Sequence, residues 1–204
     1  MANELYRFFL EKLGGSDPTQ FIGDAGEMFY SPSTGVIRLS NGTTPGGIIL
    51  GALGSTGYVG SFYDTTIQTN PIANTPVLVR YNSVWISDGV QVVDSTKLRT
   101  LHAGNWNIQF SAQMNKLDSG DDQVDFWLRK NGVDVDYSNT RIHVTGNNAK
   151  YVAAWNWVVE SISTDYFEIA WCSPDTDMRI YAEGPQTNPP RPGIPSIICS
   201  VTQV

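Results

Sequence analysis

The feature that most restricts the fold of this chain is a long series of short strand-like segments between residue 62 and the C-terminus. Apolar and β-branched runs alternate there with turn sequences such as Asn131-Gly132 and Ser173-Pro174-Asp175. The runs predicted as strands are 76–81, 97–103, 106–114, 124–129, 140–144, 151–160, 166–171, 178–182 and 195–204. Many short strands at this spacing predict an all-β sandwich or jelly roll over residues 62–204.

One of these runs is important because of the way its apolar residues are distributed. In segment 151–159 both faces are largely apolar: Tyr151, Ala153, Trp155, Trp157 and Val159 on one, and Val152, Ala154, Asn156 and Val158 on the other. A strand that is apolar on both faces is covered on both. One cover is the opposing sheet, and the second can be a partner subunit. The residues expected in the core or in a trimer interface are Trp106, Phe110, Tyr151, Trp155 and Trp157.

The first 47 residues are expected to form a separate N-terminal region. Residues 2–13 predict a short helix whose apolar face consists of Leu5, Phe8, Phe9 and Leu13. So short a helix needs a surface to dock on. Its own chain, sister chains and another protein are the three alternatives. Residues 24–47 predict a small β-hairpin module, with strands at 28–30 and 36–39 and a turn at Asn41-Gly42.

A glycine-rich segment over residues 48–61 is predicted to link this region to the larger domain. Gly51, Gly54, Gly57 and Gly60 recur at every third position. That spacing is the collagen rule, but the other positions lack proline. A tight threefold neck and a plain flexible linker are the two interpretations.

The composition excludes some partners and compartments. Charged residues are only 16% of the chain and the net charge is −7. A nucleic-acid-binding protein normally has a basic patch, and the lysines and arginines here are scattered, so no nucleic-acid partner is expected. No stretch approaches the roughly 18 apolar residues of a membrane span. Glu4 and Glu11 interrupt the apolar N-terminus, which argues against a signal peptide. Neither membrane insertion nor export is therefore expected, and assembly is expected in a cytoplasm.

Several segments resemble the complement/tumour-necrosis-factor-like jelly roll. Residues 101–111 (LHAGNWNIQFS) are similar to its "pG-x-Y-x-F-x-F" strand, and residues 126–132 (FWLRKNG) to its "L-x-K-N-G" hairpin. Residues 158–171 resemble its "L-x-x-G-D-x-V-x-L" strand pair. The resemblance covers residues 62–204. It implies a ten-stranded jelly-roll head that forms tight homotrimers, often at the tip of a stalk.

Two further segments resemble parts of virion proteins of tailed bacteriophages. Residues 191–204 are similar to the C-terminus of many such proteins with this head, and residues 26–47 look like a small module common in tail-fibre proteins. The resemblance implies a virion structural protein, a trimeric fibre or spike subunit assembled in the host cytoplasm. The N-terminal helix would attach it to another virion protein, and the head would face outward toward a host receptor or glycan.

The sequence offers little that points to catalysis, so no enzymatic activity, metal or cofactor is expected. No nucleophile-elbow, phosphate-loop or zinc-binding motif occurs. His102 is expected to be structural, and His143 is expected to face solvent. Asp118, Asp121 and Asp122 share one loop, where solvation of a turn is the simpler interpretation and a weak Ca²⁺ site the alternative. Cys172 and Cys199 are interpreted as reduced apolar thiols, with pairing left open.

Three functions therefore compete. The first is a trimeric tail fibre or spike subunit. The second is a capsid decoration protein that uses the same trimeric head. The third is a carbohydrate-binding or sugar-degrading virion protein, because the chain has 6 Trp residues and aromatic faces stack on sugars. Most of these tryptophans fall within predicted strands, where packing is the simpler use, but Trp85 and Trp127 are open to either interpretation.

Overall fold

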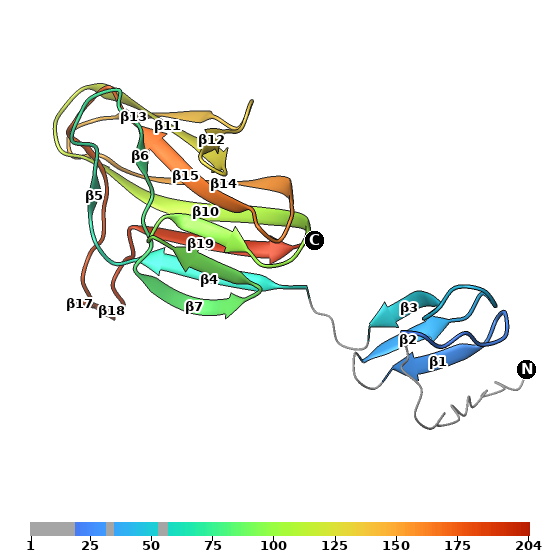
Figure 1. The fold of residues 1–204 in the computed structure, drawn as a ribbon. Coiled ribbons are helices and arrows are strands. Elements are labelled where there is room, and N and C mark those ends of the chain that lie inside the picture. Colours follow the sequence, from blue (N-terminus) through green and yellow to red (C-terminus); the bar gives the residue numbers. More distant parts are fainter. Residues whose placement is uncertain (1–18, 32–34, 53–56) are drawn as a thin grey trace, which may run out of the picture. The chain divides into compact units, whose positions relative to one another are not determined.

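The computed structural model describes residues 19–31, 35–52 and 57–204. The chain divides into two compact units, residues 1–56 and 57–204, which Figure 1 draws and which are described separately here. All regular structure in the described residues is β-strand, which confirms the all-β fold class. The helix predicted over residues 2–13, with Leu5, Phe8, Phe9 and Leu13, lies outside the described residues and stays a prediction.

The smaller unit contains a three-stranded antiparallel sheet. Its strands are β1 (Met28–Ser31), β2 (Val36–Leu39) and β3 (Ile48–Ala52), in the order β1-β2-β3. The first two confirm the predicted hairpin. The side-chain oxygen of Asn41 accepts hydrogen bonds from the backbone amides of Thr43 and Thr44 at 3.1 and 2.8 Å, so the predicted turn also forms.

The prediction of a linker over residues 48–61 needs correction, because parts of it are strand. Residues 48–52 are β3, and Val59 begins β4 (Val59–Asp64) of the larger unit. Gly60 lies in β4 for a packing reason. A Cβ added there would lie 2.6 Å from the Phe62 ring and 2.9 Å from Val90. This glycine therefore permits close packing and does not mark a flexible connection. Residues 53–56 lie outside the described residues.

The larger unit contains two seven-stranded antiparallel sheets. The first, called the β10 sheet here, has the order β5-β16-β10-β19-β4-β7, with β14 paired to the other side of β10. Its strands besides β4 are β5 (Gln68–Thr69), β7 (Ser83–Asp88), β10 (Gly104–Lys116), β14 (Lys150–Ser161), β16 (Met178–Ile180) and β19 (Ile197–Gln203).

The second, called the β15 sheet here, has the order β12-β11-β15-β9-β8, with β13 beside β11 and β6 beside β15. Its strands are β6 (Val77–Leu78), β8 (Val90–Val93), β9 (Lys97–Thr100), β11 (Asp121–Lys130), β12 (Val133–Asp134), β13 (Thr140–Thr145) and β15 (Tyr166–Cys172). A separate hairpin joins β17 (Gln186–Thr187) to β18 (Pro190–Arg191).

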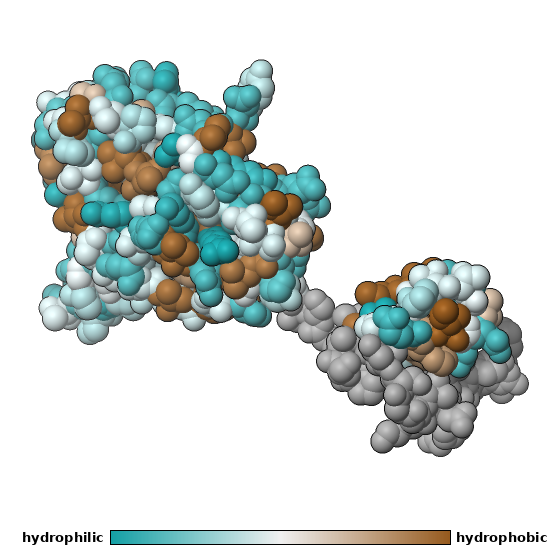
Figure 2. Space-filling model, in the orientation of Figure 1, coloured by the Kyte–Doolittle hydropathy of each residue, from teal (hydrophilic) through white to brown (hydrophobic). Residues whose placement is uncertain are grey.

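The two sheets pack face to face around one hydrophobic core. Alternation along β10 points Trp106, Ile108 and Phe110 inward, and each is at most 1% exposed. The ring of Phe110 meets that of Phe126 from the β15 sheet at a centroid distance of 5.3 Å. Complete burial of such a side chain contributes about 1.5–3 kcal/mol. Around this core, the face of the larger unit visible in Figure 2 carries hydrophobic side chains scattered among hydrophilic ones.

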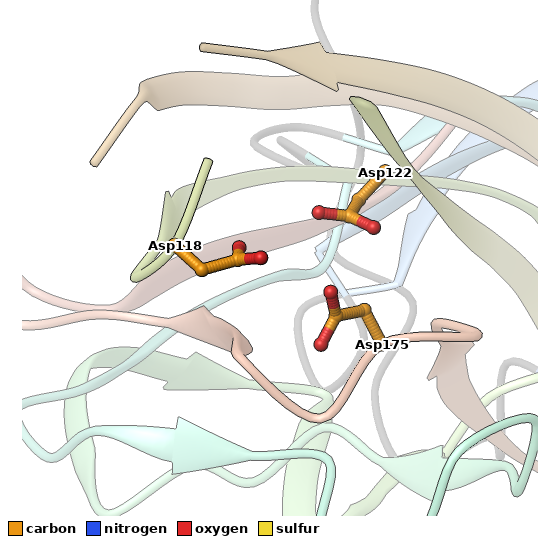
Figure 3. A group of neighbouring side chains, drawn as sticks. All are labelled: Asp118, Asp122 and Asp175. Atoms are coloured by element: carbon orange, nitrogen blue, oxygen red, sulfur yellow. The ribbon is translucent and has the colours of Figure 1, made fainter. Parts of the chain in front are cut away.

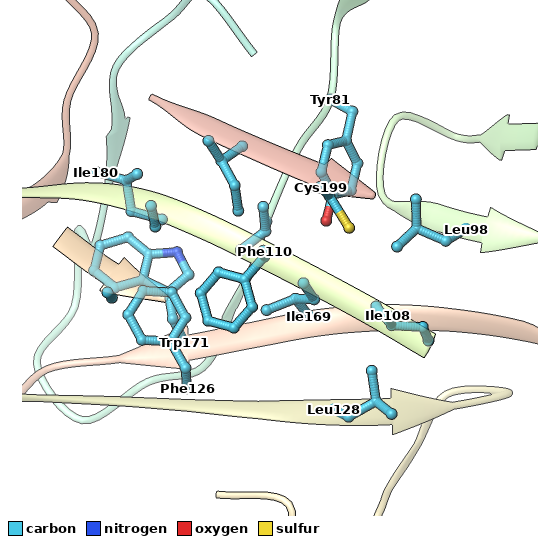
Figure 4. Close-up of a cluster of buried hydrophobic side chains, with 14 of the residues drawn as sticks. Tyr81, Leu98, Ile108, Phe110, Phe126, Leu128, Ile169, Trp171, Ile180 and Cys199 are labelled. Carbon is cyan, nitrogen blue, oxygen red and sulfur yellow. The ribbon is translucent and has the colours of Figure 1, made fainter. Parts of the chain in front are cut away.

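A buried polar pair lies within this core. Figure 4 shows the hydroxyl of Tyr81 close to the thiol of Cys199. Burial raises the pKa of Tyr81 well above its ordinary value, and burial raises that of Cys199 to about 12. Both groups are therefore neutral at physiological pH, which is the state that a packed apolar core tolerates.

Every segment between residues 62 and 204 that was predicted as a strand contains one in the structure. The predicted runs contain neither β4, β7 and β8 nor the two-residue strands β5, β12, β17 and β18. The start of β4 lies in the segment interpreted as a linker. β7 and β8 are separated by Gly89 alone, whose positive φ of 71° forms the corner between the two sheets.

Candidate functional surfaces

The outer face of the β10 sheet is the first candidate surface. Every second residue of its long strands points away from the core. At the centre of four adjacent strands these residues are Val152, Ala154, Asn156 and Val158 (β14), Asn107, Gln109, Ser111 and Gln113 (β10), Ile198, Ser200 and Thr202 (β19), and Val59, Ser61 and Tyr63 (β4). None of these central residues is charged, and the charged Lys150 and Glu160 lie at the two ends of β14. Depletion of charge is typical of the centre of a protein interface.

Strand β14 forms one edge of this face. It pairs with β10 over its whole length, from Gly104 opposite Ser161 to Asn115 opposite Lys150. Among the described residues no strand pairs with its other side. Val152 and Val158 on its outer face are 59% and 63% exposed. An edge strand this long and this apolar is a liability for a protein that stays alone in water.

The opposite edge of the face carries an exposed aromatic pair. Trp85 of β7 is 57% exposed and stacks on Tyr63 of β4, with ring centroids 4.6 Å apart. Ile86, beside it, is 48% exposed. The apolar character of the outer face therefore continues from β14 to β7.

The predicted core or interface residues occupy different depths. Trp106 and Phe110 are buried in the core, and Trp155 and Trp157 are partly buried against it. Trp155 and Trp157 lie over Phe110, with ring centroids 4.6 and 5.4 Å away. Tyr151, at the start of the strand, is 43% exposed. Four of these side chains thus line the inner side, and participation of any of them in an interface stays a prediction.

The outer face of the β15 sheet has the opposite character, because charged pairs cover it. Arg141 binds Asp125 through two nitrogens, both at 2.9 Å. Arg129 lies 3.0 Å from Asp134 and 3.8 Å from Glu168. Exposed ion pairs contribute little stability individually, but charges that face water make a surface soluble. This side of the sandwich is therefore suited to remain in solvent.

One ion pair at the edge of this sheet has a clear electrostatic signature. Lys130 lies 2.9 Å from Asp165, whose side chain is only 7% exposed. Burial alone would raise the pKa of Asp165. Hydrogen bonds from Lys130, Asn131 and the Ile162 backbone amide outweigh that effect and lower the pKa to about 2. Asp165 therefore stays ionised in the folded protein at any ordinary pH.

A cleft of about 350 Å³ opens on the outer side of the β15 sheet. Its lining comes from β11, β12, β15 and the segment that follows β12: Asp125, Trp127, Asp134, Val135, Asp136, Tyr137, Asn139 and Cys172. The indole nitrogen of Trp127 donates a hydrogen bond to Asp134 at 2.8 Å. Of the two tryptophans left open by the sequence, Trp127 thus belongs to a cleft and Trp85 to the outer face of the other sheet.

Three acidic residues meet at one end of the sandwich. One oxygen each from Asp118, Asp122 and Asp175 lies within 4.8 Å of the others, and Figure 3 shows the carboxylates converging from three segments. The side chain of Lys116, 1% exposed, forms ion pairs with Asp122 and, at 3.6 Å, with Asp118. Lys116 belongs to the β10 sheet and Asp122 to the β15 sheet, so the pair links the two layers.

The protonation of Lys116 explains what this acidic cluster does. Burial would lower its pKa, but its hydrogen bond and ion pair with Asp122, together with Asp118, leave the pKa above its ordinary value. The ammonium group therefore provides a positive charge beside Asp118 and Asp122. Asp121, the third acid of the predicted loop, is exposed and outside the cluster, whereas the sequence analysis missed Lys116 and Asp175.

The remaining candidates of the sequence lie apart from one another. His102 stacks on Tyr58 with ring centroids 3.7 Å apart, and His143 is exposed on β13. Cys172 and Cys199 are both free, the first partly exposed and the second buried. In the part of the chain that the structure describes, no helix has the length and apolar character needed to cross a membrane.

Comparison with known proteins gives no further assignment. The sequence matches no protein-family model and no curated protein. The resemblance to phage virion proteins and to the complement/tumour-necrosis-factor-like head therefore stays a prediction, and the proposal that follows depends on the chain's own geometry.

Proposed function

We propose that this chain is a non-enzymatic structural subunit of a bacteriophage virion, a homotrimeric fibre or spike protein whose larger unit is a jelly-roll head. The observation that carries the proposal is the uncharged centre of the outer face of the β10 sheet, which ends at the unpaired edge of β14. A monomer gains nothing from keeping charge off the centre of one face, whereas a self-associating protein does.

The arrangement of strands supports the jelly roll. Without the short strands β5, β6, β12 and β16, each sheet keeps five strands, in the orders β7-β4-β19-β10-β14 and β8-β9-β15-β11-β13. The chain crosses repeatedly between the layers. Strands β10 and β14 are neighbours in one sheet, but β11 and β13 of the other sheet lie between them in the sequence. Such crossings are typical of double-sheet jelly rolls.

The segments that carry the family resemblance lie in strands of the larger unit, which supports the proposal. Residues 104–111 of the first segment are in β10, and residues 126–130 of the second are in β11. Asn131 and Gly132 have positive φ angles of 53° and 80°, the conformation of a tight hairpin turn, and they lead into β12. The strand pair of the third segment corresponds to the end of β14 and to β15.

A closed threefold assembly would cover the apolar edge. An interface of this kind buries on the order of 2,000 Å² or more. Because sister subunits present the same surface, β14 of one subunit could pack on the outer face of its neighbour, and the closed ring would leave no free edge.

The smaller unit supports attachment through the N-terminal end. Ile48, Ile49 and Leu50 are consecutive in β3 and between 52% and 58% exposed. Three exposed apolar residues in a row on an edge strand need a cover. Contact of this unit with another virion protein would provide it, and would extend the attachment region predicted for residues 1–47 into β3.

Measurement of the mass in solution tests the proposal directly. Light scattering or native mass spectrometry of the full chain at micromolar concentration should give a mass three times the 22.4 kDa of one chain. A stable monomer would refute the trimer. Gold labelling of the protein on purified virions then gives its location. Label at the tail supports a fibre or spike, whereas label over the capsid replaces it with the decoration protein.

A further inference from the structure

We infer that the cleft on the outer side of the β15 sheet binds a saccharide, with Tyr137 and Trp127 as aromatic surfaces and Asp136 as the hydrogen-bonding carboxylate. A saccharide would be the ligand class of the proposed head, and the biological meaning of the site rests on the proposed function. The cleft itself is a property of the single chain. At about 350 Å³ it lies at the lower end of the size range of small-molecule sites.

Hydrogen bonds at Ser138 hold the segment that forms one wall of the cleft. Ser138 is only 5% exposed. Its hydroxyl accepts a hydrogen bond from the Leu128 amide at 3.0 Å and donates one to the Val135 carbonyl at 2.7 Å. The indole nitrogen of Trp157 donates a hydrogen bond to the Ser138 carbonyl at 3.0 Å. The segment that carries Asp136 and Tyr137 is thus fixed to both sheets and is suited to present side chains in a defined geometry.

The side chain of Tyr137 contributes nothing to the packing of the fold. It is fully exposed, at 106%, and its φ of +60° lies in the left-handed region. An aromatic residue in that region is strained, and such strain persists where the surroundings impose it, often at ligand sites. Asparagine or glycine would fit this backbone better. A strained and unburied aromatic beside a cleft is therefore more useful to a ligand than to the fold.

The polar groups of the cleft are divided between those already paired and those still free. Asp125 is paired with Arg141, and Asp134 with Arg129 and Trp127. Asp136 makes no hydrogen bond or ion pair with any described residue, and it is exposed. One free carboxylate beside two aromatic side chains is a combination that suits a sugar. The hydroxyl groups of a sugar donate hydrogen bonds to the carboxylate, and the C–H face of the sugar packs on an aromatic ring.

Other ligand classes fit less well. The unpaired carboxylate repels phosphates and other anions, and a purely apolar ligand would bury polar groups without partners. The location is also favourable, since the cleft lies on the side of the sandwich opposite to the outer face of the β10 sheet. It would stay open in a trimer that associates through that face.

Saturation-transfer NMR on the full-length protein tests the inference. The probes are D-glucose, D-galactose, D-mannose and N-acetyl-D-glucosamine at millimolar concentration. At least one should bind, and Tyr137→Ala should weaken it about tenfold, with a smaller loss for Asp136→Asn. The control is Tyr30→Ala, which removes a tyrosine that is 39% exposed on the smaller unit and should change nothing.

The outcomes distinguish this inference from the proposed trimer. If none of the four sugars binds the wild type, or if Tyr137→Ala binds as well as the wild type, the saccharide site is wrong, whatever the mass of the assembly. Binding of tetramethylammonium in place of sugars would reassign the cleft to a cation. A monomer that binds sugar through Tyr137 would retain this site and refute only the trimer.

Discussion

The two outer faces of the larger unit belong to the same sandwich and yet differ in how charge is distributed. On the β10 sheet, the outward residues at the centre of β14, β10, β19 and β4 include no charged side chain, and Lys150 and Glu160 lie only at the two ends of β14. On the β15 sheet, Arg141 pairs with Asp125, and Arg129 with Asp134 and Glu168. Both sheets are antiparallel and both bury one face in the same core, so the fold alone does not require this difference.

The difference shows that secondary structure and core packing leave the outer faces free to diverge. A chain with 16% charged residues has few charges to distribute. Placing them on one face keeps the folded protein soluble there, while the other face can associate without burying unpaired charges. If this interpretation is correct, a charge introduced on the two faces should have very different consequences.

The largest effect is expected from a charge on the outer face of β14. Ala154→Arg would bury an unpaired guanidinium in the proposed interface, at a cost of several kcal/mol per subunit, enough to weaken assembly a hundredfold or more. The matched control is Gln91→Arg, at an exposed position of β8 on the other sheet. Analytical ultracentrifugation should show dissociated Ala154→Arg and assembled Gln91→Arg. Equal behaviour of the two variants would remove the distinction between the faces.

A smaller effect is expected where one side chain connects the two sheets. Trp157 packs on Phe110 from the inner side of β14 and also holds Ser138, at the base of the cleft wall. Trp157→Ala should therefore lower the free energy of unfolding by about 3 kcal/mol and also loosen the segment around Tyr137. Urea unfolding and amide hydrogen exchange measure the two effects. If stability falls while exchange of residues 135–139 is unchanged, Trp157 does not support the cleft.

The ion pairs near the β15 sheet predict a pH dependence. The pKa of Asp165 falls from its ordinary 3.8 to about 2 in the folded protein. Because the folded value is the lower one, its ionisation stabilises the fold above about pH 4, and this stabilisation is lost as the pH falls toward 2. Asp165→Asn should cost at most about 2.5 kcal/mol at pH 7, less after screening by solvent.

Chemical unfolding at pH 7 and near pH 2 tests whether the charge of Asp165 stabilises the fold. The difference between wild type and Asp165→Asn should be largest at pH 7 and close to zero near pH 2. A difference that stays constant over this range would mean that the carboxylate acts through its shape or its hydrogen-bonding pattern and not through its charge.

Much of the fold was accessible from the sequence because local patterns determine it. Apolar and β-branched runs bounded by turn residues predicted β10 and β14, and the sequence Asn131-Gly132 predicted a turn. The pattern failed at β4, where Gly60 is required by the packing of Phe62 and Val90 but looks like part of a linker. A contact between residues distant in sequence decided that position, and no local pattern records such a contact.

The candidate sites were less accessible for the same reason. Asp118 and Asp122 were noted together because they share a loop, but Asp175 joins them only through the packing of the sheets. Trp127 was left open between a core and a ligand role, and its position in a cleft depends on how the segment after β12 folds over β11. The strained φ of Tyr137 has no signature in the sequence, since tyrosine rarely adopts it.

The smallest effect is also the one that separates a ligand site from a structural feature. Tyr137 is fully exposed and strained, so Tyr137→Gly should remove the strain without loss of packing. The expected gain is about 1 kcal/mol, or roughly 2–4 °C in the melting temperature, reduced somewhat by the entropy of glycine in the unfolded chain. Calorimetry measures it, with Gly132→Ala, at a φ of 80°, as the control that should lose stability. A residue retained at the expense of stability is expected where it serves a ligand. If Tyr137→Gly instead melts lower than the wild type, the tyrosine supports the fold, and the strongest argument for placing a saccharide beside the charged sheet is lost.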